Sequence, residues 1–105
     1  DLQLRNYIFN ISGWGVILLN EGKQERHIHP ESLVSGVLYL KVPKVVADSS
    51  NDMGNLFFPA NNSLSIVPEK GKIILFPSYL PHETKRFSSK EERICISFNL
   101  TGREK

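Results

Sequence analysis

Three histidines, the only ones in the 105-residue chain, are spaced so that they could share one metal ion. His27 and His29 are separated by one residue, and His82 follows much later. Side chains on a β-strand repeat every two positions, so His27 and His29 would point from one face of a strand. Imidazole suits Fe, Zn, Cu or Ni, and three protein ligands with open positions are typical of a catalytic site. Alone the pair is a weak motif, because two exposed histidines beside Pro30 would look the same.

A carboxylate two residues after His29 offers a second ligand set. His29, Glu31 and His82 would form the two-histidine, one-carboxylate triad of non-heme Fe(II) oxygenases, and His27 would then support the site from outside. Pro30 lies between His29 and Glu31 and argues mildly against a regular strand there. The spacing therefore leaves two sets open, one with His27 and one with Glu31 in its place.

One face of the last predicted strand, residues 93–100, is polar, whereas its other face is apolar like that of a core strand. The polar positions alternate with apolar ones and are Arg93, Cys95, Ser97 and Asn99. An arginine on such a face indicates a cavity that binds an anion, because guanidinium engages a carboxylate through two parallel hydrogen bonds. The simpler alternative is a salt bridge of Arg93 with Glu91 or Glu92, and Arg86 is a rival partner for an anion.

Tyr39 lies on the clearest predicted strand, on the same face as Ser35 and Val37. Its hydroxyl could donate to the same anion as Arg93. The alternative is a core tyrosine whose hydroxyl sits at the edge of the barrel. We expect Trp14 to belong to the core rather than to the site.

The pattern of β-formers and turn residues predicts about eight short strands and little or no helix. Strands are predicted for residues 2–11, 14–20, 25–29, 33–42, 55–58, 64–67, 72–76, 83–87 and 93–100. Ser12-Gly13 separates the first two, and Gly36 indicates a bulge or a close backbone approach. Residues 43–54 form a long loop, expected as a lid over a substrate, and residues 101–105 are expected to fray. Many short strands with Gly and Pro turns favour an all-β sandwich or barrel.

Composition is that of one ordinary domain, expected to span residues 1–105. The net charge of +2 is small and no basic stripe occurs, so nothing favours a nucleic-acid partner. Cys95 is the only cysteine, which suits a reducing compartment and predicts a cytoplasmic location. No apolar run is long enough to span a membrane, and no signal peptide is visible. Exposed strand edges favour a homodimer.

The order of these features resembles a family of 2-oxoglutarate/Fe(II)-dependent oxygenases found in bacteria and phages. The resemblance runs from about residue 14 to residue 99, and the combination is more specific than any single piece. It rests on Trp14, His27-x-His29-Pro30, Ser35-Gly36-Val37-Leu38-Tyr39, Val42-Pro43, Gly71, Phe76-Pro77-Ser78, His82, Arg93 and Ile96-Ser97-Phe98-Asn99. The resemblance implies a double-stranded β-helix, the cupin-like jelly roll, with Fe(II) and 2-oxoglutarate as cofactors.

Carried over residue by residue, the resemblance implies a role for five positions. His27 matches the first metal ligand of the family, His82 matches the distal histidine, and His29 stands where an acid usually stands. Arg93 matches the basic residue that pairs with the distal carboxylate of 2-oxoglutarate, and Tyr39 falls on the strand that often supplies a hydroxyl to it. Three neutral imidazoles would leave Fe(II) with a charge of +2, where one carboxylate would leave +1.

The activity that the resemblance implies is hydroxylation of an unidentified small molecule or peptide by O2, through a ferryl intermediate. One alternative is a three-histidine, cupin-type metalloenzyme that does not use 2-oxoglutarate and holds a substrate carboxylate on Arg93. Another is a non-enzymatic jelly-roll module that binds a metal or nothing.

Overall fold

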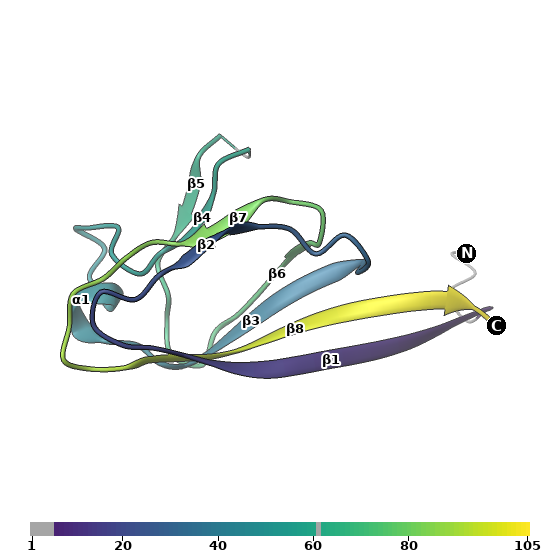
Figure 1. Ribbon diagram of the computed structural model, residues 1–105, viewed down its shortest axis with the longest axis horizontal. Helices are drawn as coiled ribbons and strands as arrows, with labels where there is room; N and C mark the ends of the chain where they lie inside the picture. Colours follow the sequence, from purple (N-terminus) through teal and green to yellow (C-terminus); the bar gives the residue numbers. More distant parts are fainter. Residues whose placement is uncertain (1–5, 61) are drawn as a thin grey trace.

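Eight strands form two four-stranded sheets in the computed structural model, which describes residues 6–60 and 62–105 (Figure 1). The first sheet has, in spatial order, β1 (Tyr7–Leu18), β8 (Arg93–Glu104), β3 (Val34–Lys41) and β6 (Ile73–Pro77). The second has β2 (Gln24–His27), β7 (His82–Thr84), β4 (Leu56–Phe58) and β5 (Leu64–Ile66). Neighbouring strands are antiparallel. This architecture confirms the predicted all-β jelly roll.

The core lies between the two sheets and is supplied by alternate residues of each strand. On β3, Ser35, Val37 and Tyr39 are buried, whereas Leu40 points outward and is 43% exposed. This alternation follows from the two-residue repeat of a strand. The buried cluster consists of Val37, Tyr39, Leu56, Phe58, Phe76 and Cys95.

The first sheet begins with one long strand where two were predicted. β1 pairs with β8 residue by residue, and the ladder runs straight through Ser12-Gly13. The predicted break there is wrong because an added Cβ at Gly13 would meet only ordinary contacts, so this glycine marks no turn. β8 also continues to Glu104 and pairs with the start of β1, so the predicted fraying of residues 101–105 is wrong too. Residues 2–5 of the first predicted strand lie outside the described residues.

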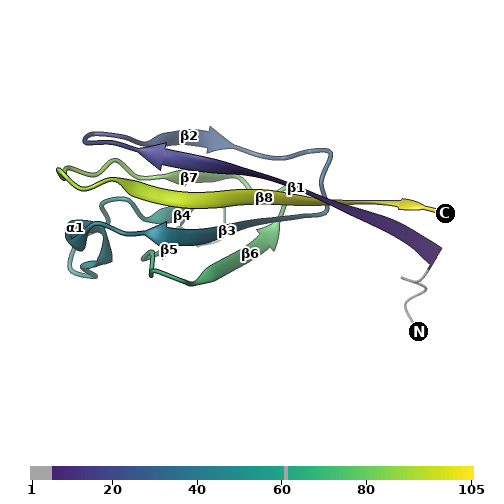
Figure 2. The ribbon, with the colours of Figure 1, turned by 90° about the horizontal axis from the view of Figure 1, so that it is seen from below.

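β1 and β8 project beyond the rest of the sandwich as a two-stranded arm, whose tip holds the start of β1 and the end of β8 (Figures 1 and 2). The backbone N–H of Lys105 donates to the carbonyl of Asn6 at 2.9 Å. The arm thus places the start of β8, where Arg93 lies, deep in the sandwich and far from the chain ends.

Gly36 marks a close approach rather than a bulge. A Cβ at this position would lie 2.2 Å from the ring of Phe98 and 2.9 Å from Leu75. The glycine therefore leaves room for the Phe98 ring against β3, as the close-approach interpretation predicted.

The segment of residues 43–54 packs at the Arg93 end of the sandwich. It contains a single-turn helix, α1 (Lys44–Ala47), whose Val46 is fully buried. The carbonyl of Gly54 accepts a hydrogen bond from Nε of Arg93 at 3.2 Å. The segment thus contacts Arg93 directly, and the lid expected over a substrate stays a prediction. Among the described residues, no helix is long and apolar enough to cross a bilayer.

Candidate metal centre

The three histidines converge on one point between β2 and β7. His27 and His82 face each other across the antiparallel pair, with ring centroids 4.2 Å apart. The His29 ring lies 5.0 Å from that of His27 and 5.2 Å from that of His82. One nitrogen from each imidazole lies within 4.8 Å of the others. This spacing is close enough for small ring rotations to bring all three nitrogens onto one ion.

His29 reaches the cluster by a different route from the one its spacing suggested. β2 ends at His27, so the predicted strand over residues 25–29 is two residues too long. His29 is held instead by its backbone, whose N–H donates to the carbonyl of Ser78 at 2.9 Å, and by a turn in which Ser32 donates to its carbonyl. These two backbone hydrogen bonds therefore position the third imidazole.

Two of the imidazoles, those of His29 and His82, are favoured in the neutral state, which is the state that binds a metal. Burial lowers the pKa of His82 to about 4, and burial together with the neighbouring His27 lowers the pKa of His29. Nδ1 of His27 lies 2.6 Å from the carbonyl oxygen of Glu25, and Nδ1 of His82 lies 2.9 Å from that of Leu80. Since a carbonyl only accepts, both rings carry their proton on Nδ1 and leave Nε2 free for an ion.

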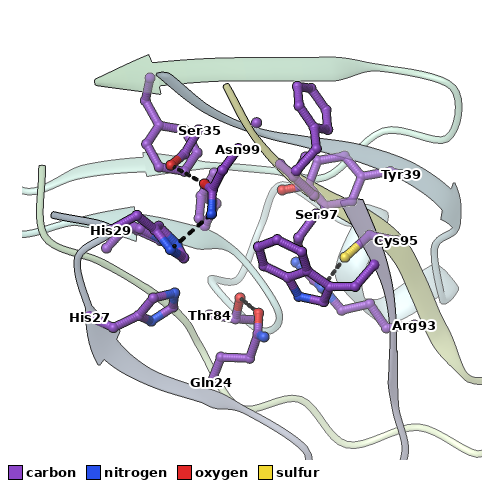
Figure 3. Close-up of a pocket in the computed structure, with 17 residues that line it drawn as sticks. Gln24, His27, His29, Ser35, Tyr39, Thr84, Arg93, Cys95, Ser97 and Asn99 are labelled. Atoms are coloured by element: carbon purple, nitrogen blue, oxygen red, sulfur yellow. Dashed lines mark hydrogen bonds between the residues drawn. The ribbon is translucent and has the colours of Figure 1, made fainter. Parts of the chain in front are cut away.

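The same histidines line a cavity of about 90 Å³ that opens between the sheets. This volume is several times the roughly 10–15 Å³ that one water needs. Figure 3 shows His27 and His29 on one side of it and Arg93 on the other. The polar face predicted for the last strand, which carries Cys95, Ser97 and Asn99 after Arg93, forms part of its wall.

Arg93 is buried, and the part of the chain that the structure describes offers it no counter-ion. Its side chain is 1% exposed, and it donates through Nε to Gly54 and through Nη1 to Sγ of Cys95 at 3.8 Å. Its Nη2 has no partner, and the hydroxyl of fully buried Tyr39, whose ring lies 5.2 Å from the guanidinium carbon, has none either. Burial raises the pKa of Tyr39 to about 12, so the hydroxyl keeps its proton and can donate.

The structure places outside the site the carboxylates and the second arginine that the sequence offered as alternatives. Within residues 6–60 and 62–105, no carboxylate forms a salt bridge with Arg93, and Glu92 pairs with Lys41 at 3.7 Å. Arg86 is exposed and does not line the cavity. Glu31 is exposed beside His29 in a separate shallow depression and is not part of the cluster of three nitrogens.

Three lining residues were not predicted from the sequence. Trp14 was expected in the core but is 41% exposed, and its ring lies 6.2 Å from that of His29. Thr84 donates to the Gln24 side chain at 3.1 Å across the floor of the cavity. Thr84 is two residues after His82, so the strand period could have found it. The strand period could not have found Gln24, because a bulge between Gln24 and His27 interrupts the two-residue alternation.

The sequence matches one oxygenase family, and the fold is similar to those of solved oxygenases and cupin domains. The family model described as "Putative 2OG-Fe(II) oxygenase" matches residues 12–99. A prolyl-4-hydroxylase of Pseudomonas putida is 21% identical with a TM-score of 0.65, over 86% of this chain and 50% of that one. No curated protein matches the sequence.

Two further solved structures have a similar fold. The viral collagen prolyl hydroxylase of Paramecium Bursaria Chlorella virus-1, solved as a 2-oxoglutarate complex, is 18% identical with a TM-score of 0.69, over 89% of this chain and 60% of that one. A cupin domain from Bordetella pertussis is 14% identical with a TM-score of 0.54, over 89% of this chain and 81% of that one. The chain thus spans about half the length of the two hydroxylases, and these likenesses show the shared jelly roll.

Proposed function

Because this chain belongs to the 2OG-Fe(II) oxygenase family, whose model matches residues 12–99, we propose that it is an Fe(II)- and 2-oxoglutarate-dependent dioxygenase. His27, His29 and His82 would hold the iron. Arg93 and Tyr39 would hold the distal carboxylate of 2-oxoglutarate. The other reactants are O2 and a small molecule or a peptide.

The observation that carries this proposal is the buried Arg93 guanidinium on the side of the cavity opposite the histidines, which no carboxylate of the described residues pairs with. Burying a charge without a partner costs several kcal/mol, so a buried guanidinium needs an anion. Among the described residues, Nη2 of Arg93 and the Tyr39 hydroxyl are buried without a hydrogen-bond partner, and both residues line the cavity that the histidines line. A carboxylate placed between them would accept a hydrogen bond from each.

The donor set also fits the iron. Three neutral imidazoles are ligands that Fe(II) accepts, and three protein ligands leave positions open for a chelating keto acid and O2. When bound, iron and 2-oxoglutarate supply the oxidising chemistry for hydroxylation of a C–H bond, with loss of CO2 from the keto acid. The chain contributes orientation through Arg93 and Tyr39, and the apolar walls formed by Leu56 and Phe76 limit the water around the reacting atoms.

Anaerobic absorption spectroscopy tests the proposal directly. We expect a visible charge-transfer band when 2-oxoglutarate is added to the Fe(II)-loaded chain, because its keto-acid end chelates the metal. Succinate, which has the distal carboxylate but no keto group, is the control and should give no band. Metal binding without a band on adding 2-oxoglutarate would overturn the proposal.

A second candidate is favoured by the absence of an acid from the cluster of three nitrogens. A three-histidine, cupin-type metalloenzyme would use the same iron or another divalent ion without 2-oxoglutarate. Arg93 would then hold a carboxylate of the substrate itself. A chain that binds metal stoichiometrically, and whose spectrum 2-oxoglutarate leaves unchanged, would support this candidate.

We also propose that the chain pairs with a second copy through β1. This strand is an edge of its sheet, is 12 residues long and carries neither a charged residue nor a proline. The other edges are protected, since β6 ends in Pro77, β2 carries charges and β5 has only three residues. Antiparallel pairing of two β1 edges would give a two-fold symmetric dimer.

Sedimentation analysis tests the pairing. We expect a dimer that Gly15→Lys converts to a monomer, because a lysine on an edge strand opposes pairing. An added Cβ at Gly15 meets nothing within 4 Å, so the fold should be unaffected. A wild-type chain that stays monomeric at high concentration would contradict the proposal.

The cytoplasm is the proposed location. Cys95 is the only cysteine, and it is buried and unpaired in the wall of the cavity. A reducing compartment would keep this thiol next to Arg93 from being oxidised.

A further inference from the structure

The third imidazole of the cluster differs from the other two in what its Nδ1 contacts. Backbone carbonyls fix the proton of His27 and His82 on Nδ1. Nδ1 of His29 lies instead 3.4 Å from the side-chain amide nitrogen of Asn99 (Figure 3). An amide nitrogen donates and an amide oxygen accepts, so the end of Asn99 that faces His29 determines where the His29 proton sits.

The two orientations of the Asn99 amide have opposite consequences for an ion. With its nitrogen toward His29, as in the structure, Nδ1 must accept and the proton sits on Nε2. With its oxygen toward His29, Nδ1 carries the proton and Nε2 is free, as in His27 and His82. The orientations fill nearly the same volume, so packing does not choose between them. Hydrogen bonds must make the choice.

Two buried serines hold the other end of the amide. Oγ of Ser35 donates to Oδ1 of Asn99 at 2.7 Å and also lies 3.0 Å from Oγ of Ser78. Ser35 is 2% exposed and Ser78 is 0% exposed, so water does not compete for these groups. A hydroxyl has one proton. If Ser35 gives it to Ser78 instead, its oxygen can accept from the Asn99 nitrogen, and the amide can reverse.

We propose that Asn99, oriented by Ser35 and Ser78, is a positioning residue that selects the tautomer of His29, and that metal binding requires the reversed amide. This inference rests on the proposed function only in taking His29 as a metal ligand. Ser78, Ser35 and Asn99 thus form a hydrogen-bonded relay with two states, and the site offers two free Nε2 atoms in one state and three in the other. The relay does not contact the ion and acts only through His29.

Long-range ¹H–¹⁵N NMR of the imidazoles at pH 8 reads the tautomers without any turnover. We expect metal-free His29 to be protonated on Nε2, and His27 and His82 on Nδ1. Zn(II), a diamagnetic probe, should move the His29 proton to Nδ1. Asn99→Asp, whose carboxylate only accepts, should show the Nδ1–H form of His29 before any metal is added.

Zn(II) titration of the variants gives the second readout. Asn99→Leu should weaken binding by about 10–100-fold, the usual effect of removing a group that orients a metal-binding histidine. Asn10→Leu is the matched control and should bind Zn(II) as the wild type does, because Asn10 is exposed on β1 and does not line the cavity.

The outcomes separate the two proposals. If Zn(II) binds the wild type but the His29 tautomer is the same in the wild type, Asn99→Asp and Asn99→Leu, the relay is overturned and the metal centre stands. Zn(II) bound through Nδ1 of His29 would overturn the relay as well. If Zn(II) does not bind at all, the metal centre fails, while the metal-free spectra still decide whether Asn99 sets the tautomer.

Discussion

Replacing His82 by alanine is expected to abolish stoichiometric iron binding. His82 faces His27 across the β2–β7 pair and has one free Nε2, so its loss leaves at most two imidazoles on the ion. Two imidazoles would bind Fe(II) too weakly to retain it through desalting. Metal analysis after anaerobic loading and desalting should find about one iron per wild-type chain and close to none in His82→Ala.

Glu31→Gln is the matched control for that experiment. Glu31 is the exposed carboxylate beside His29, and the variant should keep its iron, because this group lies outside the cluster of three nitrogens. Loss of iron in Glu31→Gln, with retention in His27→Ala, would instead identify the ligand set as His29, Glu31 and His82. A wild-type chain that holds no metal would favour the non-enzymatic module.

Arg93→Met is expected to weaken the binding of 2-oxoglutarate while leaving the iron in place. The variant removes the charge-assisted hydrogen bond from Nη2, worth about 1.5–3 kcal/mol, so affinity for 2-oxoglutarate should fall about 10–100-fold. Titration of the charge-transfer band measures this loss. Tyr39→Phe removes only the hydroxyl and should weaken binding by about tenfold.

Stability distinguishes a ligand-binding arginine from a structural one. Without an anion, the Arg93 charge is buried and its Nη2 is unpaired, so Arg93→Met should unfold at the same temperature as the wild type or higher. The exposed Arg86 is the control, and Arg86→Met should retain full affinity for 2-oxoglutarate. Unchanged 2-oxoglutarate affinity in Arg93→Met would contradict the assigned role.

Most of the fold could be predicted because strand period and turn residues are local signals. The jelly roll, the polar face of β8 and the buried face of β3 all follow from two-residue alternation. The break predicted at Ser12-Gly13 failed because pairing with β8 overrides a local turn signal. Strand pairing is a property of two distant segments, and one segment alone does not reveal it.

The site was predictable in its residue types and less so in its geometry. His27 and His29 were expected together on a strand face, whereas His29 lies beyond the strand and is placed by Ser78. Which nitrogen of each imidazole is unprotonated depends on its contact with Glu25, Leu80 or Asn99. These contacts form only when the chain folds. Spacing names candidate ligands, but it does not say which nitrogen each one offers.

The arm of β1 and β8 has a mechanical consequence. Asn6 and Lys105 lie at its tip, and the ladder runs from Tyr7–Glu104 at the tip to Leu18–Arg93 at the other end. A force that pulls the two ends apart would therefore load one pair of residues at a time, as a zipper opens, rather than all pairs together. The pair that holds Arg93 would be the last to separate, so tension on Asn6 and Lys105 would leave the Arg93 end of the cavity intact until the whole ladder had opened.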